Sequence, residues 1–206
     1  MRLPPIFTKL TDHSQANIAL KFNLKCGGVN QLLPAQKLGF LAQGKTMIVG
    51  IDVTHPAPKS LEGTPSIAGV VASVDGMYGQ WPGSIRCQES RKEMVQDLDI
   101  MMKERLDLWK EKNKRLPERL LIYRDGVSEG QYQTVLTDEL GKIREACQIY
   151  RPAPDPKITI IIVGKRHHTR FYPTRDEDAD MSKKGNPKNG TIVDRGITME
   201  KGVSIS

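Results

Sequence analysis

The sequence predicts an α/β domain built on one mixed sheet. Three short apolar runs come first, at residues 46–52, 66–75 and 84–88, and two more follow at 120–123 and 158–163. The first runs are separated by turn-rich segments, which is typical of an antiparallel meander. Each later run is preceded by a helical pattern, and helical crossovers connect parallel strands. We therefore expect a three-stranded antiparallel meander that parallel strands extend, with helices on its flanks.

Length and composition are those of an ordinary globular protein. The 206 residues suffice for one domain, or for one domain and a piece of another. Lys and Arg number 31 against 24 Asp and Glu, which gives a formal charge of +7. This excess favours an anionic partner such as nucleic acid or an acidic membrane surface, although a merely basic soluble protein explains it as well.

The cysteines and the N-terminal residues bear on the cellular compartment. Cys26, Cys87 and Cys147 are odd in number and far apart, which argues against a disulfide framework and a zinc site. Asp12 and His13 interrupt the region where a signal peptide needs an apolar stretch, and no later run is as long as a membrane span. We expect a cytoplasmic protein, possibly also nuclear, that has no membrane partner.

The first expected helix covers residues 14–25. Its apolar positions Ala16, Leu20 and Leu24 repeat every four residues, and Gly27 and Gly28 follow as a stop signal. Residues 31–45 are expected to be a connector to the first strand. Gly76 and Gly79 mark the turn between the second and third strands.

Two further helices and a strand complete the prediction. A helix is expected from Ser90 to Lys112, with Glu93 in its first turn. Its apolar stripe consists of Val95, Leu98, Met102, Leu106 and Trp109. A second helix begins at a capping box of Ser128 and Gln131. Its stripe consists of Tyr132, Leu136, Leu140, Ile143 and Cys147. The run from Ile158 to Val163 is almost wholly β-branched, which predicts a central strand covered on both faces.

Asp52 and Asp125 each close an apolar strand and precede a loop, where ligands of α/β sheets collect. For either residue alone, a role in capping a turn or helix is the more common one. As a pair on one sheet edge they would repel each other unless a cation lies between them. Oxygen ligands favour Mg²⁺, with Mn²⁺ possible, and two such ions can promote phosphodiester hydrolysis.

Four ordered motifs resemble the PIWI domain of eukaryotic, fungal-like Argonaute proteins. They are GIDVTHP at 50–56, RKEMVQDL at 91–98, YRDGVSEGQ at 123–131 and KRHHTRFYPT at 165–174. The resemblance runs from about residue 12 to Thr198 and implies a ribonuclease H-like fold. It implies a remnant of the MID domain at 1–30, the connector at 31–45, and a C-terminally truncated PIWI domain at 46–206.

The same resemblance implies the chemistry of the site. Asp52 and Asp125 match the two catalytic, metal-binding aspartates, and Glu93 matches the glutamate finger, with Glu89 as its rival. The metal would be two Mg²⁺ ions. The family's fourth ligand lies on a later segment, and the histidines of this chain do not match it; they are His55, His167 and His168. The chain alone is therefore expected to be inactive.

Two basic groups are candidates for binding a guide RNA. Lys21 and Lys25 lie four apart on the first expected helix, a spacing that more often marks a solvated face. The resemblance implies that both bind the guide 5′ phosphate. A second group follows the last strand, with Phe171 and Tyr172 beside it, and is suited either to phosphate binding and base stacking or to a solvated loop. The resemblance implies that it binds the guide backbone. It comprises Lys165, Arg166, His168 and Arg170.

The leading interpretation is guide-RNA-directed cleavage of complementary target RNA by the parent protein, with silencing-complex proteins as possible partners. A non-cleaving fragment that binds a guide or a partner protein is the alternative. An unrelated ribonuclease H-like nuclease or integrase is a third interpretation, and it would not explain the basic motifs at Lys21, Lys25 and 165–170.

Overall fold

The computed structural model describes residues 12–165, 168–180, 182, 185–193 and 196 of the chain. The chain divides into two compact units, residues 1–165 and 166–206. The first unit holds the main sheet and its helices, and the second holds a small hairpin.

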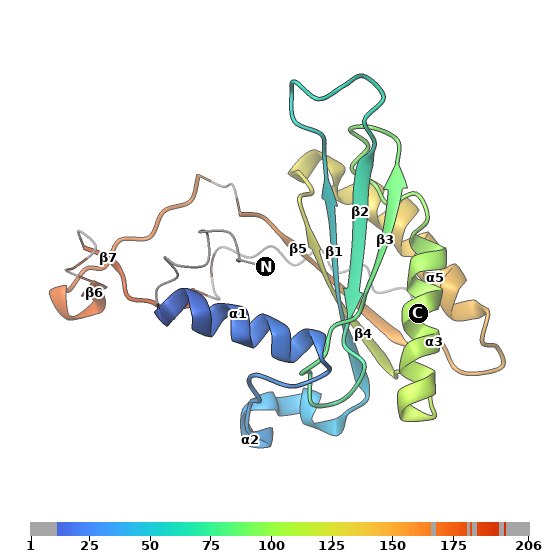
Figure 1. Cartoon of the computed structure of the whole chain (residues 1–206), viewed down its shortest axis with the longest axis horizontal. Helices are drawn as coiled ribbons and strands as arrows, with labels where there is room; N and C mark the ends of the chain where they lie inside the picture. Colours follow the sequence, from blue (N-terminus) through green and yellow to red (C-terminus); the bar gives the residue numbers. More distant parts are fainter. Residues whose placement is uncertain (1–11, 166–167, 181, 183–184, 194–195, 197–206) are drawn as a thin grey trace, which may run out of the picture. The chain divides into compact units, whose positions relative to one another are not determined.

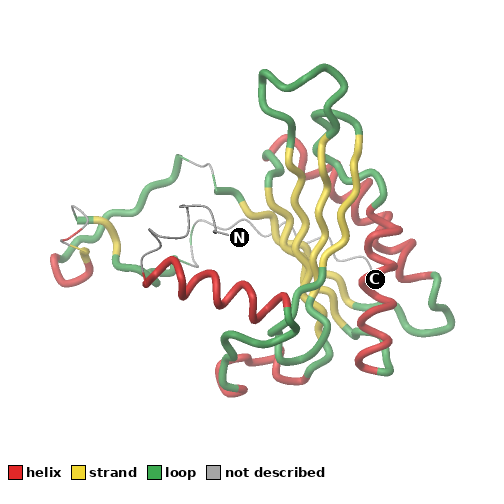
Figure 2. The backbone as a smooth tube through the Cα atoms, viewed as in Figure 1, coloured by secondary structure: helices red, strands yellow, loops and turns green. Residues whose placement is uncertain are grey.

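One five-stranded sheet forms the centre of the first unit, in the order β3-β2-β1-β4-β5 (Figures 1 and 2). Its strands are β1 Thr46–Thr54, β2 Ser66–Ala72, β3 Gly83–Gln88, β4 Arg119–Asp125 and β5 Lys157–Val163. The β3, β2 and β1 strands pair antiparallel, whereas β4 is parallel to β1 and β5 is parallel to β4. This arrangement confirms the predicted meander and its parallel extension.

The expectation that residues 158–163 form a central strand is wrong for the described sheet. β5 is its last strand, and its side chains are at best partly buried. A continuous apolar run does not distinguish a strand with two neighbours from one with a single neighbour, because both can pack helices on a face.

Helices cover one face of the sheet. Successive strand residues point to opposite faces, and in β1 Met47, Val49 and Ile51 are buried while Asp52 is exposed. The helices α3 (Leu98–Asn113) and α5 (Leu140–Gln148) lie beside each other on the buried side (Figure 1). Their largest contributions to the core are Leu98, Met101, Met102, Leu106, Trp109 and Ile143. The opposite face exposes apolar side chains, among them Ile67, Val71, Ile85, Tyr123 and Ile161.

The helix expected from Ser90 begins only at Leu98, so Glu93 lies in a loop. Arg91 has a φ of +61°, which is incompatible with a continuous right-handed helix. The Gln88 side chain also fixes the loop, because its Nε2 donates to the carbonyls of Lys92 and Met94. These hydrogen bonds replace the first turns of the expected helix.

The last expected helix contains a π turn. The segments α4 (Tyr132–Thr134), η4 (Val135–Glu139, the π turn) and α5 follow one another directly. The capping box of Ser128 and Gln131 is confirmed. The expected stripe is wrong in its first half, because Val135 and Glu139 are buried in place of Leu136 and Leu140.

The helix α1 (Asp12–Lys25) confirms the expected first helix. Gln80, between β2 and β3, donates to the carbonyl oxygens of Leu24 and Gly28 and so ties the end of α1 to that loop. The expected connector is not plain loop, since it contains α2 (Ala35–Leu38) and the 3-10 helix η2 (Gly39–Gln43).

The second unit contains η5 (Asp176–Asp178) and a short antiparallel pair of β6 (Ala179–Asp180) and β7 (Asn186–Pro187). Across the described part of the chain, no helix combines the length and apolar character needed to cross a bilayer.

The helix-covered face predicts where substitutions destabilise the fold. Ile122 on β4 is fully buried, so Ile122→Ala is expected to lower the free energy of unfolding by about 2–5 kcal/mol. Ile85→Ala on the open face, where the side chain is 68% exposed, is expected to cost less than about 1 kcal/mol. Urea unfolding of both variants measures the difference, and equal losses would contradict the assignment of the faces.

Candidate active site

Asp52 and Asp125 lie at the carboxyl ends of neighbouring parallel strands. Ile51 pairs with Arg124, so the two aspartates that follow are at the same level and on the same face of the sheet. Strands lie about 4.8 Å apart, so their carboxylates can share a ligand. Asp52 Oδ1 accepts a hydrogen bond from the Val53 amide, and Asp125 Oδ1 accepts one from the Gly126 amide, both at 2.9 Å.

Glu93 comes to the same edge from the loop before α3. A Cβ atom placed on Gly126 would lie 3.1 Å from Glu93 Oε1 and 3.5 Å from Asp52 Oδ1. Gly126 also has a φ of +86°, a conformation that favours glycine. Because Gly126 has no side chain, there is space beside it for the carboxylates of Glu93 and Asp52. The rival Glu89 is 69% exposed and pairs with Lys92 at 3.5 Å.

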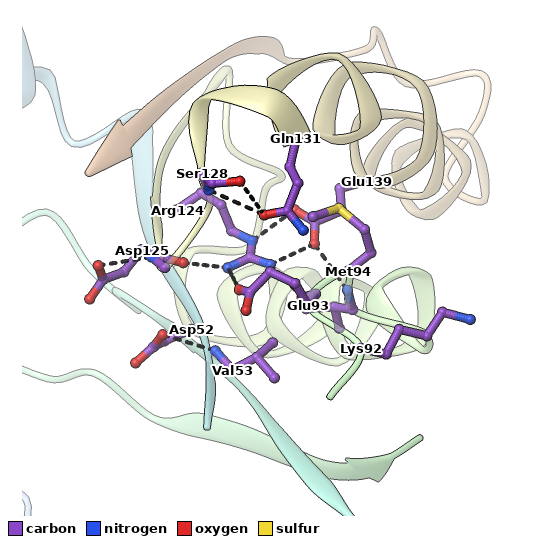
Figure 3. A network of polar contacts seen from close by, with 12 residues as sticks. Asp52, Val53, Lys92, Glu93, Met94, Arg124, Asp125, Ser128, Gln131 and Glu139 are labelled. Carbon is purple, nitrogen blue, oxygen red and sulfur yellow. Dashed lines mark hydrogen bonds and ion pairs between the residues drawn. The ribbon is translucent and has the colours of Figure 1, made fainter. Parts of the chain in front are cut away.

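Arg124 holds Glu93 at this edge (Figure 3). The guanidinium is fully buried and donates from Nη1 to Glu93 Oε1 at 3.0 Å and from Nη2 to the Glu93 carbonyl at 2.7 Å. Nη1 also donates to the Asp125 carbonyl. The same side chain thus fixes the loop of Glu93 to the end of the strand that carries Asp125.

Glu139 is the second anionic partner of Arg124. Its Oε2 accepts from Arg124 Nε at 2.9 Å and its Oε1 accepts from Nη2 at 3.1 Å. Burial alone would lower the pKa of Arg124, but the hydrogen bond and charge of Glu139, and then Glu93, outweigh burial and raise it. Arg124 therefore carries its charge inside the protein.

His55 contacts the other oxygen of Glu93. Ser66 Oγ accepts from the Arg91 amide at 2.8 Å and lies 2.8 Å from His55 Nδ1. With its proton on Nε2, His55 donates to Glu93 Oε2 at 2.8 Å. Glu93 is thus held from both sides, although its side chain remains 13% exposed.

Lys165, predicted to bind the guide backbone, forms an ion pair with Asp125 Oδ2. This hydrogen bond and charge lower the pKa of Asp125 and raise the pKa of Lys165. The charge of Asp52 also contributes to the raised pKa of Lys165. The two aspartates therefore favour a cation beside them.

The donor set is suited to a hard divalent cation, because it consists of carboxylate oxygens. In the described residues no three His, Cys, Asp or Glu side chains form a ready-made metal cluster. The two Glu93 carboxylate oxygens are hydrogen-bonded to Arg124 and His55, and one Asp125 oxygen is ion-paired with Lys165. A bound cation would compete with these partners for the carboxylate lone pairs.

The other predicted binding residues lie on α1, in the second unit or outside the described residues. Lys21 and Lys25 are exposed on α1, and Lys25 lines a hollow of about 290 Å³ with Trp81. Arg166 and His167 are outside the described residues. His168 and Arg170 belong to the second unit, where both are exposed.

Arg124, Glu139 and Ser66 are the residues of the site that sequence reasoning missed. A signal for Arg124 was present, since it follows Leu120 and Ile122 at alternate positions and so falls on the helix-covered face. A buried arginine needs acidic partners. Glu139 lies between Val135 and Ile143 at helical spacing, which could have marked it as such a partner.

A mixed sheet that gathers carboxylates at the ends of its first and fourth strands defines a ribonuclease H-like domain. Residues 6–204 match the Piwi domain family. In Oryza sativa subsp. japonica, protein argonaute 18 is 44% identical over 189 residues, which cover 87% of this chain and 17% of the relative. Protein argonaute 2 of the same species is 41% identical over 186 residues, which cover 90% and 18%.

Solved structures agree with these relatives. The N. crassa QDE-2 AGO MID-PIWI domains are 42% identical, with a TM-score of 0.62 over 74% of this chain and 45% of that one. Kluyveromyces polysporus Argonaute with a guide RNA is 31% identical, with a TM-score of 0.77 over 89% and 23%. The chain therefore belongs to the Argonaute family and carries a Piwi domain of ribonuclease H-like fold. It spans less than a fifth of the length of the curated relatives described above.

Removal of the Lys165 ammonium is expected to raise the pKa of Asp125. In Lys165→Met the carboxylate loses its ion pair, so the pKa should return toward the ordinary aspartate value of about 3.9. In the wild-type protein the folded pKa of Asp125 is depressed. The ion pair therefore stabilises the fold fully above the ordinary aspartate pKa, and this stabilisation is lost as pH falls through the folded pKa. Carboxyl ¹³C titration of Asp125 measures the change. Lys92→Met, which removes the partner of Glu89, should leave the Asp125 titration unchanged.

Arg124→Met is expected to destabilise the protein by about 3–5 kcal/mol, because it leaves the buried Glu139 carboxylate without its cation. Arg86→Met is the matched control. It removes an ion pair with Glu104 whose side chains are 36% and 37% exposed, so its cost should stay near or below about 1 kcal/mol. Urea unfolding measures both losses. A cost for Arg124→Met as small as that of the control would contradict the role of Arg124.

Proposed function

We propose that this Piwi domain serves guide-RNA-directed cleavage of a complementary target RNA in gene silencing. The observation that carries the proposal is the approach of Asp52, Glu93 and Asp125 at one sheet edge, with a cationic side chain against Asp125. The relative of known structure from Kluyveromyces polysporus contains a guide RNA, which supports the same class of ligand here.

The proposed metal is Mg²⁺, as two ions, with Mn²⁺ as a possible substitute. Asp52 and Asp125 would hold it, and Glu93 would complete the acidic side of the site. When bound, such ions activate a water molecule and stabilise the leaving oxygen of a phosphodiester. Arg124 and His55 orient the Glu93 carboxylate, and the Val53 and Gly126 amides orient the two aspartates.

Guide binding would rest on phosphate contacts of the basic residues. We propose Lys21 and Lys25 for the guide 5′ phosphate and the segment after β5 for the guide backbone. That segment comprises Lys165, Arg166, His168 and Arg170. Contacts of this kind are independent of sequence and weaken with salt, so base pairing would select the target. Complementary target RNA and silencing-complex proteins are the proposed partners, and the cytoplasm, possibly with the nucleus, is the proposed location.

A non-cleaving guide-binding role is the second candidate function. It is favoured by the pairing of Glu93 with Arg124 and His55 and of Asp125 with Lys165, which occupies carboxylate oxygens that a metal would need. In that role the same basic residues would hold a guide, and silencing would not require hydrolysis.

A fusion separates the two functions. The chain replaces the matching segment of the Kluyveromyces polysporus Argonaute, and the fusion is loaded with a 5′-phosphorylated guide RNA and given a matched target and Mg²⁺. Asp125→Ala is expected to reduce cleavage by about a thousandfold, equivalent to about 4 kcal/mol of transition-state stabilisation.

Asp155→Ala is the control, because Asp155 is an exposed aspartate that pairs with Arg151 at 3.5 Å. It should cleave like the wild-type fusion. Retention of the guide with no Asp125-dependent product would refute cleavage and support the second function.

A further inference from the structure

Glu139 is a buried acid that the proposed chemistry does not use directly. Its side chain is on the helix-covered side of the domain, and the residue is 1% exposed. It lies in the π turn Val135–Glu139, and π turns inside helices are frequent at functional sites. Val135 and Ile143, four residues away on either side, are buried apolar residues. An acid at this position costs free energy unless it is fully paired.

Both carboxylate oxygens of Glu139 are engaged. Oε2 accepts from Arg124 Nε, and Oε1 accepts from Arg124 Nη2 and from the Val95 amide at 3.0 Å. Arg124 then donates to the side chain and the carbonyl of Glu93. Figure 3 shows the guanidinium between the carboxylates of Glu93 and Glu139. The contacts therefore run without a gap from the π turn to Glu93.

The helix also fixes the backbone that follows Glu93. Lys142, three residues after Glu139, donates from Nζ to the carbonyls of Val95 at 2.9 Å and Gln96 at 2.8 Å. The Val95 amide is held by Glu139 and the Val95 carbonyl by Lys142. One stretch of helix thus holds this loop through its main chain as well as through Arg124.

We propose that Glu139 is a positioning residue for Glu93 and acts through Arg124, an assignment that rests on the proposed function. One guanidinium lies between two carboxylates. Because Glu139 offsets the charge of Arg124 and fixes its plane, Glu93 keeps its negative charge directed at the edge of Asp52 and Asp125. Without Glu139, Arg124 would have Glu93 as its remaining carboxylate partner, and Glu93 would be drawn away from a metal ion.

The carboxyl ¹³C signal of Glu93 tests the positioning without any metal. The signal is assigned by its disappearance in Glu93→Gln, and it is compared in the full chain and in Glu139→Gln. We expect it to shift in Glu139→Gln and to stay in place in Glu104→Gln, which removes a carboxylate from another arginine pair. An unchanged Glu93 signal in Glu139→Gln would overturn the proposal.

Mn²⁺ affinity, measured by electron paramagnetic resonance, tests whether Glu139 acts through Glu93. Glu139→Gln should weaken Mn²⁺ binding about tenfold in the wild-type background, a loss typical of residues that orient a metal ligand. In the Glu93→Gln background the same substitution should change the affinity less than about twofold. Equal losses in both backgrounds would show that Glu139 only supports the fold, and would overturn the assignment.

Glu139→Asp covers the case in which Glu139→Gln does not fold. It keeps the charge but withdraws the carboxylate by one methylene group, so the same shift of the Glu93 signal is expected, and its absence overturns the proposal. Failure of the proposed function has a different signature. If Asp52→Asn and Asp125→Asn leave Mn²⁺ affinity unchanged, the metal site is refuted, while the ¹³C comparison still decides whether Glu139 positions Glu93.

Discussion

Arg124 is fully buried at the end of a central strand, and the rest of the site depends on how its charge is paired. A buried cation is costly unless nearly every donor has an acceptor. Here the acceptors come from the neighbouring Asp125 carbonyl and from two other segments, the Glu93 loop and the π turn with Glu139. Pairing Arg124 therefore requires these segments to meet at the sheet edge where Asp52 and Asp125 lie.

The two carboxylate partners of Arg124 therefore differ in role: Glu139 stabilises the fold, and Glu93 is available to the site. The helix-covered side satisfies Arg124 with Glu139, whereas Glu93 keeps a partly exposed side chain next to Asp52. At the same sheet edge, Lys165 pairs with Asp125 and lowers the pKa of Asp125. The carboxylates thus have two cationic partners: Arg124 is buried, and the side chain of Lys165 is 73% exposed. The exposed lysine is the partner that an incoming metal ion could displace with little structural change.

The sequence was sufficient to predict the five strands and the neighbouring positions of Asp52 and Asp125, because both follow from apolar runs and their order. It was not sufficient for the start of α3, since Arg91 in a left-handed conformation and the hydrogen bonds of Gln88 override a good helical pattern. The buried stripe before α5 was misplaced because a π turn shifts the helical register at Glu139. Pairing between residues as far apart as Glu93, Arg124 and Glu139 leaves no periodic signal.

The central claim is that Arg124 holds Glu93 beside Asp52 and Asp125, so that the three carboxylates form one cation site at the ends of β1 and β4. Paramagnetic broadening of backbone amide signals by low concentrations of Mn²⁺ tests this claim most directly in the full chain. The account predicts that the amides of Val53 and Gly126, which bond to Asp52 and Asp125, broaden first and that Arg124→Met abolishes this selectivity. Broadening that begins at the acidic turn Asp176–Asp178, with Val53 and Gly126 still sharp, would contradict it.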